Sequence, residues 1–248
     1  MKKGKLVIIP TYNEQENILE MVHAVMNLEG DFELLVIDDN SPDGTALIVM
    51  KLQNAFPERL HLLKRKGKLG LGTAYIAGFK YAIEKGYQYV FEMDADFSHN
   101  PSDLVKLHKA CAEDGFDMAI GSRYITGVNV VNWPMGRVLM SFFASKYVQF
   151  ITGLPIKDTT AGFKCYSINV LKAMNLDKIK FIGYAFQIEM KFTAWKLGFK
   201  IIEVPIIFTD RTKGTSKMSR GIFKEAILGV LYMKIRSFFK TYKPVNQT

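Results

Sequence analysis

Short apolar runs alternate with amphipathic segments over the first hundred residues of the chain. Four runs have the length and the apolar content of buried strands, at residues 5–10, 32–37, 60–64 and 87–93. Three segments between them carry apolar positions at helical spacing, at residues 16–27, 45–55 and 73–84. Because strands that alternate with helices pair in parallel through crossover connections, the pattern predicts an α/β fold.

Two of the predicted strands end in aspartates, Asp38-Asp39 and Asp94-Ala95-Asp96. In a parallel sheet the ligand lies beyond the carboxyl ends of the strands, so both acidic groups are expected at one crevice. Two carboxylates one residue apart suit Mg²⁺ or Mn²⁺, which prefer oxygen ligands and bridge carboxylates to phosphate. Solvated turn aspartates are the alternative. The apolar strand before Asp94 and the second acidic pair favour the metal.

Several basic residues are candidates for phosphate contact. Arg123 follows an apolar run at residues 118–120, and its guanidinium suits bidentate phosphate binding, although a surface ion pair is the alternative. Arg211 and Lys217 flank a glycine-containing loop that can close on a phosphate or remain a plain basic loop. His99 lies near the aspartates, and we expect it to support the site rather than to act as a base.

Composition and missing motifs exclude several classes of protein. The turn at residues 10–14 contains no glycine, which argues against dinucleotide binding, and no P-loop pattern occurs. Hydrophobic residues make up 48% of the chain, which excludes disorder as its main state. Cys111 and Cys165 are the two cysteines, too few for a disulfide framework or a four-cysteine zinc site.

The positive charge is concentrated near the C-terminus. Nine basic and two acidic residues fall in residues 209–248, which gives this segment +7 of the net charge of +9. Apolar positions at helical spacing predict amphipathic helices over residues 222–242, as one helix or two in series, and over residues 136–151. Such helices pack on their own domain or on a partner, or lie in a membrane interface. The charge itself fits a solvated face or an anionic membrane surface. Nucleic acid is disfavoured, since no binding motif accompanies the charge.

No apolar stretch approaches the ~18 residues of a membrane span. The first apolar run, at residues 6–10, is also too short for a signal-peptide core. The sequence therefore predicts neither an integral membrane protein nor a secreted one.

At this point the motifs resemble those of glycosyltransferase family 2. That likeness rests on residues 9–14, 37–44 and 93–96. A narrower likeness to the polyprenyl-phosphate (dolichol-phosphate) mannose synthases of this family rests on residues 70–75, 96–101, 121–124 and 211–217. The resemblance covers about residues 5–220.

The resemblance implies a GT-A fold, with a mixed, mostly parallel sheet and helices on both faces. It implies inverting transfer of mannose from GDP-mannose to a polyprenyl (dolichyl) phosphate with Mg²⁺ or Mn²⁺. It assigns catalysis to Asp94, Asp96, Arg123, Arg211 and Lys217. The residues that it assigns to the nucleotide sugar are Pro10, Tyr12, Glu14, Ile37, Asp39, Asp94, Ala95, Asp96, Arg123, Arg211 and Lys217.

The resemblance places the metal on Asp94 and Asp96. Some relatives carry a glutamine at the position of Ser98 and use it on the metal. The serine is shorter, so a water molecule is the alternative to direct contact here.

We expect a GT-A catalytic domain at residues 1–217, with a nucleotide-binding half at about 1–125 and an acceptor-side half at about 126–217. A basic helical extension follows at residues 218–248. The likeness is to the short form without C-terminal transmembrane helices. Such a protein would be held at the cytoplasmic face of a membrane by its own basic amphipathic helices or by a small membrane subunit.

Two alternatives remain open at this stage. One is the same fold with UDP-glucose, another nucleotide sugar or another acceptor. The other is a non-catalytic membrane adaptor that binds a nucleotide sugar, which would be expected to have a broken metal site.

Overall fold

The computed structural model describes residues 3–211, 213, 221–239 and 241–245. The first half of the chain forms β1 (Lys3–Thr11), α1 (Gln15–Met26), β2 (Phe32–Asp38), α2 (Thr45–Leu52), β3 (Leu60–Lys64), α3 (Leu71–Lys85), β4 (Tyr87–Glu92), α4 (Asp103–Ala112) and β5 (Met118–Ser122). The second half forms β6 (Val130–Val131), α5 (Met135–Thr152), β7 (Lys164–Ser167), α6 (Ile168–Ala173), the 3-10 helix η1 (Leu176–Lys178), α7 (Ala185–Lys196), β8 (Ile201–Pro205), β9 (Phe208–Thr209) and α8 (Gly221–Phe239). Each strand and helix predicted from the apolar pattern is present, although α2 ends at Leu52 rather than at residue 55 and α8 ends at Phe239 rather than at residue 242.

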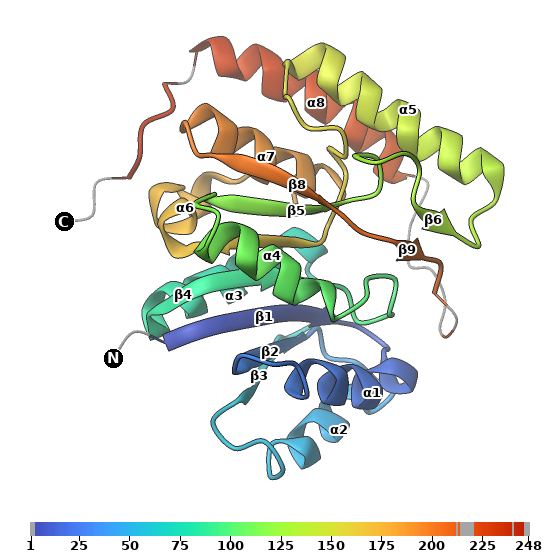
Figure 1. The fold of residues 1–248 in the computed structure, drawn as a ribbon, viewed down its shortest axis with the longest axis vertical. Helices are drawn as coiled ribbons and strands as arrows, with labels where there is room; N and C mark the ends of the chain where they lie inside the picture. Colours follow the sequence, from blue (N-terminus) through green and yellow to red (C-terminus); the bar gives the residue numbers. More distant parts are fainter. Residues whose placement is uncertain (1–2, 212, 214–220, 240, 246–248) are drawn as a thin grey trace.

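A seven-stranded sheet runs through the molecule in the order β3-β2-β1-β4-β7-β5-β8 (Figure 1). β7 is antiparallel to both of its neighbours, and the other pairings are parallel. The predicted mixed, mostly parallel sheet is therefore confirmed. The same sheet includes β5 from the expected nucleotide-binding half and β7 and β8 from the expected acceptor-side half.

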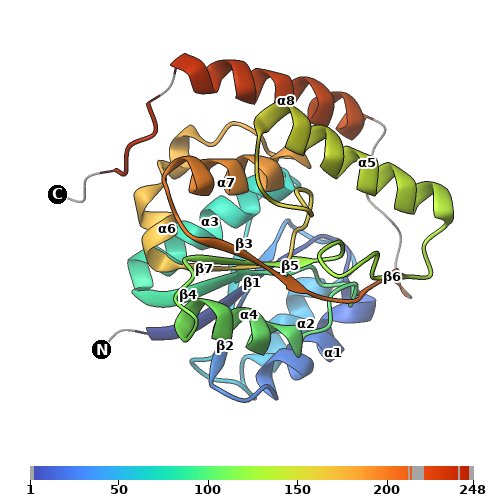
Figure 2. The same cartoon turned by 45° about the horizontal axis from the view of Figure 1, so that its top comes forward.

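Helices cover both faces of this sheet, which explains why the interior strand β1 has an unbroken apolar run at residues 6–9 (Figure 2). Leu6 and Ile8 of β1 belong to the core cluster shared with α3, α6 and α7. Val7 and Ile9 point to the opposite face and pack with residues of α1 and α4. All four side chains are fully buried. Strand alternation thus distributes one apolar run between two cores.

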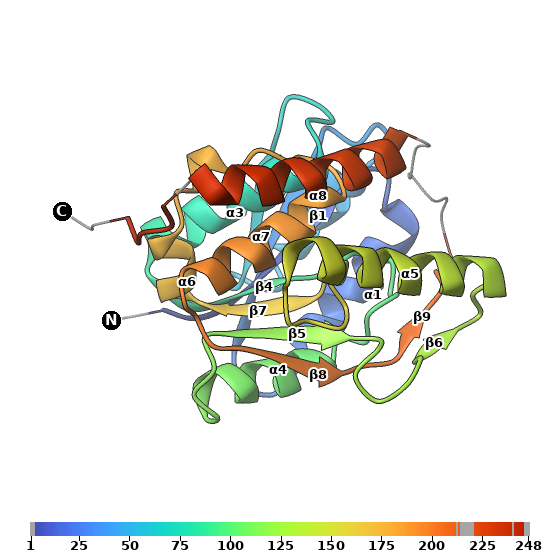
Figure 3. The same ribbon diagram turned by 90° about the horizontal axis from the view of Figure 1, so that it is seen from above.

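A further layer, made of α5 and α8, lies over α7 (Figure 3). Val230 and Met233 of α8 are buried against Val148 of α5 and Phe192 of α7. The basic tail therefore forms one helix over residues 221–239, and part of this helix packs on its own domain. Among the described residues, no helix combines the length and the apolar character needed to cross a membrane.

Strand register brings the polar motifs to one edge of the sheet. Pro10 pairs with Ile37, and Thr11 pairs with Asp38, so β1 and β2 end together. Ile8 pairs with Glu92, which places the end of β4 beside them. The loops that follow these three strands consequently lie next to one another, as expected from the sequence.

We predict that Gly78→Val destabilises the fold. A Cβ atom at Gly78 of α3 would lie 2.7 Å from Ile8 Cδ1 and 3.0 Å from Ile37 Cδ1, so the helix would have to move off the sheet. Overpacking of this kind costs about 1–3 kcal/mol in the free energy of unfolding, measured by urea denaturation. Gly136→Val is the control, since nothing lies within 4 Å of a Cβ there. Equal stability of the two variants would contradict the tight contact between α3 and β1.

Candidate active site

The loops after β1 and β2 are bonded to each other. The backbone N–H of Asn13 donates to Ser41 Oγ, and that of Glu14 donates to Thr45 Oγ1, both at 3.0 Å. The fully buried Asp38 carboxylate accepts the Ser41 backbone N–H at 3.0 Å and the Ser41 hydroxyl at 2.5 Å. These contacts fix the two predicted nucleotide-binding loops as one unit, and Glu14 is buried within it.

The remaining residues expected at the nucleotide lie in the same unit. Pro10 and Ile37 are paired in the sheet, and Tyr12 and Asp39 follow them at the strand ends. The Asp39 carboxylate is already engaged by an arginine that the sequence analysis missed. Arg65 Nε lies 2.5 Å from Asp39 Oδ1, and Arg65 Nη2 lies 2.7 Å from Asp39 Oδ2.

The Asp94-Ala95-Asp96 motif follows β4 directly. Ala95 and Asp96 are buried, and Asp96 Oδ1 accepts the backbone N–H of Ser98 at 3.1 Å. Arg211 Nη2 lies 2.8 Å from Asp96 Oδ2. The fold thus brings together a carboxylate and a cation that are 115 residues apart in the chain, both of which were candidates from the sequence.

The side chains at this position fit a hard divalent cation. Burial, followed by the charge of Asp96, raises the pKa of Asp94 to about 7, while Arg211 opposes the shift. Two crowded carboxylates are the environment that a cation would relieve. Ser98 Oγ is buried and has no hydrogen-bond partner in the structure. The described residues contain no group of three His, Cys, Asp or Glu that could hold a metal by themselves. Mg²⁺ does not require such a group, because it is usually bound by one or two carboxylates, with water and phosphate oxygens as its other ligands.

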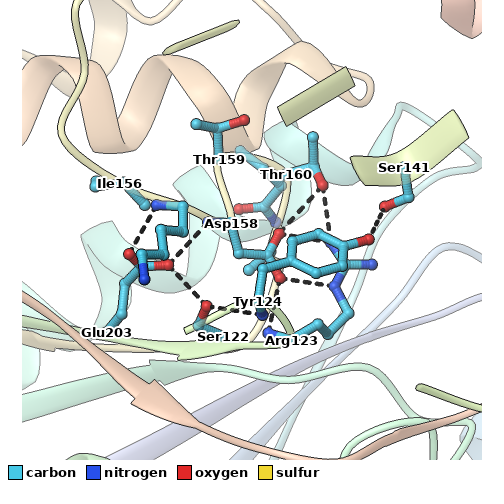
Figure 4. Close-up of polar contacts among 12 residues, drawn as sticks. Ser122, Arg123, Tyr124, Ser141, Ile156, Asp158, Thr159, Thr160 and Glu203 are labelled. Atoms are coloured by element: carbon cyan, nitrogen blue, oxygen red, sulfur yellow. Dashed lines mark hydrogen bonds and ion pairs between the residues drawn. The ribbon is translucent and has the colours of Figure 1, made fainter. Parts of the chain in front are cut away.

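Arg123 forms a buried ion pair at the end of β5 (Figure 4). Its Nε and Nη2 atoms donate to Asp158 Oδ2 at 2.7 Å and Oδ1 at 2.6 Å, and Nη2 also donates to Thr160 Oγ1 at 2.8 Å. Contact between Arg123 and a phosphate stays a prediction, because in this structure the guanidinium faces Asp158. Asp158 was not among the residues expected from the sequence, because it lies in a loop with no strand or helix periodicity to mark it.

The loop that carries Asp158 is itself anchored from two sides. Glu203 of β8 accepts the Asp158 backbone N–H at 2.8 Å. Lys191 of α7 is fully buried and donates to the carbonyl oxygens of Thr159 at 3.0 Å and Ala161 at 2.6 Å. The loop that carries the partner of Arg123 is therefore held in place by β8 and α7.

His99 is buried beside aromatic rings, near enough to Asp96, Arg123 and Asp158 to interact with their charges. Its ring stacks on Phe163 at 4.9 Å and meets Phe208 edge-on at 5.1 Å. Burial lowers the pKa of His99 to about 4, so the ring is neutral at pH 7. This favours the supporting role expected from the sequence over that of a base.

From the basic loop at residues 211–217 the structure describes Arg211 and Lys213. Arg211 contacts Asp96 as described, and Lys213 Nζ lies 3.0 Å from Glu20 Oε1 of α1. Lys217 lies outside the described residues, and its assignment stays a prediction.

We predict that Asp158→Asn lowers the free energy of unfolding by about 3 kcal/mol, because it leaves Arg123 buried without a counter-charge. Burial raises the pKa of Asp158, but the charge and hydrogen bonds of Arg123 outweigh burial and hold this pKa below its ordinary value. The stabilisation is therefore complete above about pH 4 and is lost as the pH falls through the folded-state pKa.

Urea denaturation of wild type and variant at pH 7 and in acid tests this prediction. Asp177→Asn is the control, since the Asp177–Lys80 pair is exposed and should change stability by less than about 1 kcal/mol. A difference between wild type and Asp158→Asn that grows in acid would contradict the assigned ion pair.

Comparison with known proteins gives similar chains over nearly the whole length. The chain is 45% identical over 231 residues to a polyprenol monophosphomannose synthase of Mycolicibacterium smegmatis, covering 93% of this chain and 87% of that protein. It is 43% identical over 225 residues to an undecaprenyl-phosphate mannosyltransferase of Micrococcus luteus, covering 91% of each.

Solved structures share the fold at low sequence identity. A mannosyltransferase from Pyrobaculum calidifontis, in complex with GDP-Man and Mn²⁺, matches with a TM-score of 0.59 at 17% identity, over 98% of this chain and 66% of that one. Glucosyl-3-phosphoglycerate synthase from Mycobacterium tuberculosis, with Mg²⁺ and UDP, matches with a TM-score of 0.66 at 17% identity, over 94% and 79%. These matches confirm the predicted GT-A fold, whose relatives bind Mg²⁺ or Mn²⁺.

The model of the family described as glycosyl transferase family 2 matches residues 6–174. This match covers more than half of the chain. Together with the strand-end aspartates and the two relatives above 40% identity, it shows that the chain belongs to glycosyltransferase family 2.

Proposed function

We propose that this protein transfers mannose from GDP-mannose to a polyprenyl phosphate, with inversion at the anomeric carbon and with Mg²⁺ or Mn²⁺ as cofactor. The observation that carries the proposal is the pair of relatives, 45% and 43% identical over more than nine-tenths of the chain, both named for the formation of mannosyl polyprenyl phosphates. The intact Asp94-Ala95-Asp96 motif supports catalysis over a purely binding role.

The acceptor in this reaction needs no strong base. One oxygen of the polyprenyl phosphate, already an anion near neutral pH, attacks the anomeric carbon, and the bond from that carbon to the diphosphate breaks with its electron pair on the leaving oxygen. No proton has to move in this step. The absence of an assigned His–Asp dyad is therefore compatible with the chemistry, and catalysis rests on positioning and on charge stabilisation.

The residues after β4 would stabilise the negative charge of the diphosphate leaving group. Asp94 and Asp96 would hold the divalent cation, which when bound neutralises charge that develops on the diphosphate. Arg211, 2.8 Å from Asp96, is close enough to contact a diphosphate held there. On the nucleotide side, the unit formed by Tyr12, Glu14 and Asp39 would bind the nucleoside.

The layer formed by α5 and α8 supports a lipid acceptor. Its exposed aromatic residues include Phe150 at 87%, Phe239 at 86% and Phe238 at 72% exposed. No Asp or Glu occurs at residues 135–152 or 227–239. Lys146 Nζ lies 5.4 Å from the Phe142 ring and Lys234 Nζ lies 5.3 Å from the Phe238 ring, so cations border the apolar surface. Apolar residues with a cationic border are typical of helices in an anionic membrane interface.

We predict that the protein labels polyprenyl phosphate from GDP-mannose and not from UDP-glucose. Label in the organic phase should disappear with EDTA and return with Mg²⁺ or Mn²⁺. Asp96→Ala should lower kcat by at least about 100-fold, the scale of losing one electrostatic stabiliser of the transition state. The control is Asp114→Ala, an exposed carboxylate after α4. Transfer from UDP-glucose alone would contradict the assignment of GDP-mannose as donor. Transfer from neither nucleotide sugar would favour a non-catalytic adaptor or another acceptor.

We predict that the α5–α8 layer binds anionic membranes. Phe143→Glu combined with Phe238→Glu should weaken co-sedimentation with phosphatidylglycerol-containing vesicles at least about tenfold, because two apolar side chains no longer insert. Activity on a short-chain acceptor in detergent should remain. Leu47→Glu, on the exposed face of α2, provides the matched control. Unchanged co-sedimentation of the double variant would show that another surface binds the membrane.

A further inference from the structure

The Asp39 carboxylate, expected at the nucleoside, is occupied by protein groups. Arg65 lies just past β3, where its backbone N–H continues the ladder by donating to Asp38 O at 2.8 Å. From there its guanidinium makes the two-pronged contact with Asp39, and each of these side chains is only 9% exposed. Leu69 adds its backbone N–H to Asp39 Oδ2 at 3.3 Å.

This occupancy limits what Asp39 can offer a ligand. A carboxylate has about four acceptor positions, and Arg65 and Leu69 use three of them. A base edge or a ribose diol that presents two adjacent donors would need two free positions side by side. Asp39 can therefore accept one further hydrogen bond. It cannot bind a nucleoside in bidentate fashion, through both carboxylate oxygens, while Arg65 is in place.

Arg65 also holds the turn that leads into α3. Its Nη1 donates to Thr73 Oγ1 at 2.7 Å, and its Nη2 donates to Gly70 O at 3.3 Å. The other side of the turn is packed against the segment before α7, since a Cβ at Gly70 would lie 3.2 Å from Ile182 O. Gly70 has a φ of +100°, a conformation that side-chain-bearing residues rarely adopt. The turn is thus held in one conformation from both sides.

The turn held by Arg65 reaches the nucleotide-binding unit at Tyr12. Lys68 is exposed at the tip of the turn, and its Nζ lies 5.1 Å from the centroid of the Tyr12 ring. Arg65, Asp39 and the turn therefore form one bonded assembly, which places a cation against the aromatic ring expected to contact the nucleoside.

We propose that Arg65 is a positioning residue for the nucleoside of the donor. It leaves Asp39 able to accept one hydrogen bond from the nucleoside. It also holds the turn at residues 66–70, including Lys68, in the conformation that lines one side of the nucleoside site. The inference rests on the proposed function only in that a nucleoside diphosphate binds at this edge of the sheet.

A double-mutant cycle on nucleotide affinity tests the proposal. Calorimetric titration with GDP should show Arg65→Lys and Asp39→Asn each binding about tenfold more weakly, the effect of losing a charge-assisted hydrogen bond. Because both changes break the same assembly, their effects should not add, and the double variant should bind GDP about tenfold more weakly than wild type, like each single variant. In the transfer assay, the loss should fall mainly on the donor KM rather than on kcat.

Two further variants separate positioning from folding. Arg59→Lys is the control, since the Arg59 side chain bonds the carbonyl oxygens of Met26 and Phe32 and lies before β3, at the opposite end of the strand from Arg65. It should leave GDP affinity unchanged. Lys68→Met alters an exposed side chain and should weaken GDP binding several-fold without changing the melting temperature.

The proposal is overturned if Arg65→Lys binds GDP like wild type, if the losses of the two single variants add in the double variant, or if Lys68→Met has no effect. UDP is titrated in parallel. If wild type binds UDP more tightly than GDP, the donor proposed above is wrong, and the double-mutant cycle is then measured with UDP affinities.

Discussion

Parallel pairing of β1 with both β2 and β4 is the constraint on which the rest of the molecule depends. With helices on both faces, each of these strands carries a buried apolar run, and the polar residues of the candidate site lie in the loops that follow the runs. The register ends β1 and β2 together and ends β4 beside Ile8 of β1, and each strand is followed by a loop with a carboxylate. The site is thus a consequence of strand pairing, and the loops add chemistry to positions that the sheet has already fixed.

Charges buried at strand ends need partners, and the structure supplies them from distant segments. Asp39 is paired with Arg65 and Arg123 with Asp158. Glu92 and Lys164 are both fully buried, with Lys164 Nζ 3.0 Å from Glu92 Oε2. Removing one partner of such a pair leaves an uncompensated charge, which costs far more than the pair itself contributes. These pairs therefore hold the loops of the site in one arrangement more than they add to stability.

The sequence identified helices and strands whose buried side chains are apolar, whether one face or the whole element is buried. It failed to identify elements that bury polar side chains. Periodicity identified the four strands β1 to β4, the three helices α1 to α3, and the two amphipathic helices α5 and α8. It did not identify α7, because Gln187, Glu189 and Lys191 are buried within that helix and obscure its apolar pattern. β7 was missed for the same reason, since it begins with the buried Lys164. Asp96 and Arg211 were found as motifs, but their contact depends on tertiary structure alone.

The same reasoning links the exposed helical layer to the site. α5 carries exposed apolar residues, yet its first turn is fastened to the catalytic region by Arg137, whose Nη1 lies 2.8 Å from Asp210 Oδ1, next to Arg211. One turn later, Ser141 accepts the hydroxyl of Tyr124, the neighbour of Arg123, at 2.8 Å. A helix that rests in a membrane interface would thus be bonded to the chain neighbours of both candidate phosphate-binding cations, Arg211 and Arg123. On the proposed function, this connection would place a lipid phosphate at the membrane surface close to the site, because the helix proposed to contact the bilayer is bonded to residues next to the cations proposed to receive the phosphate.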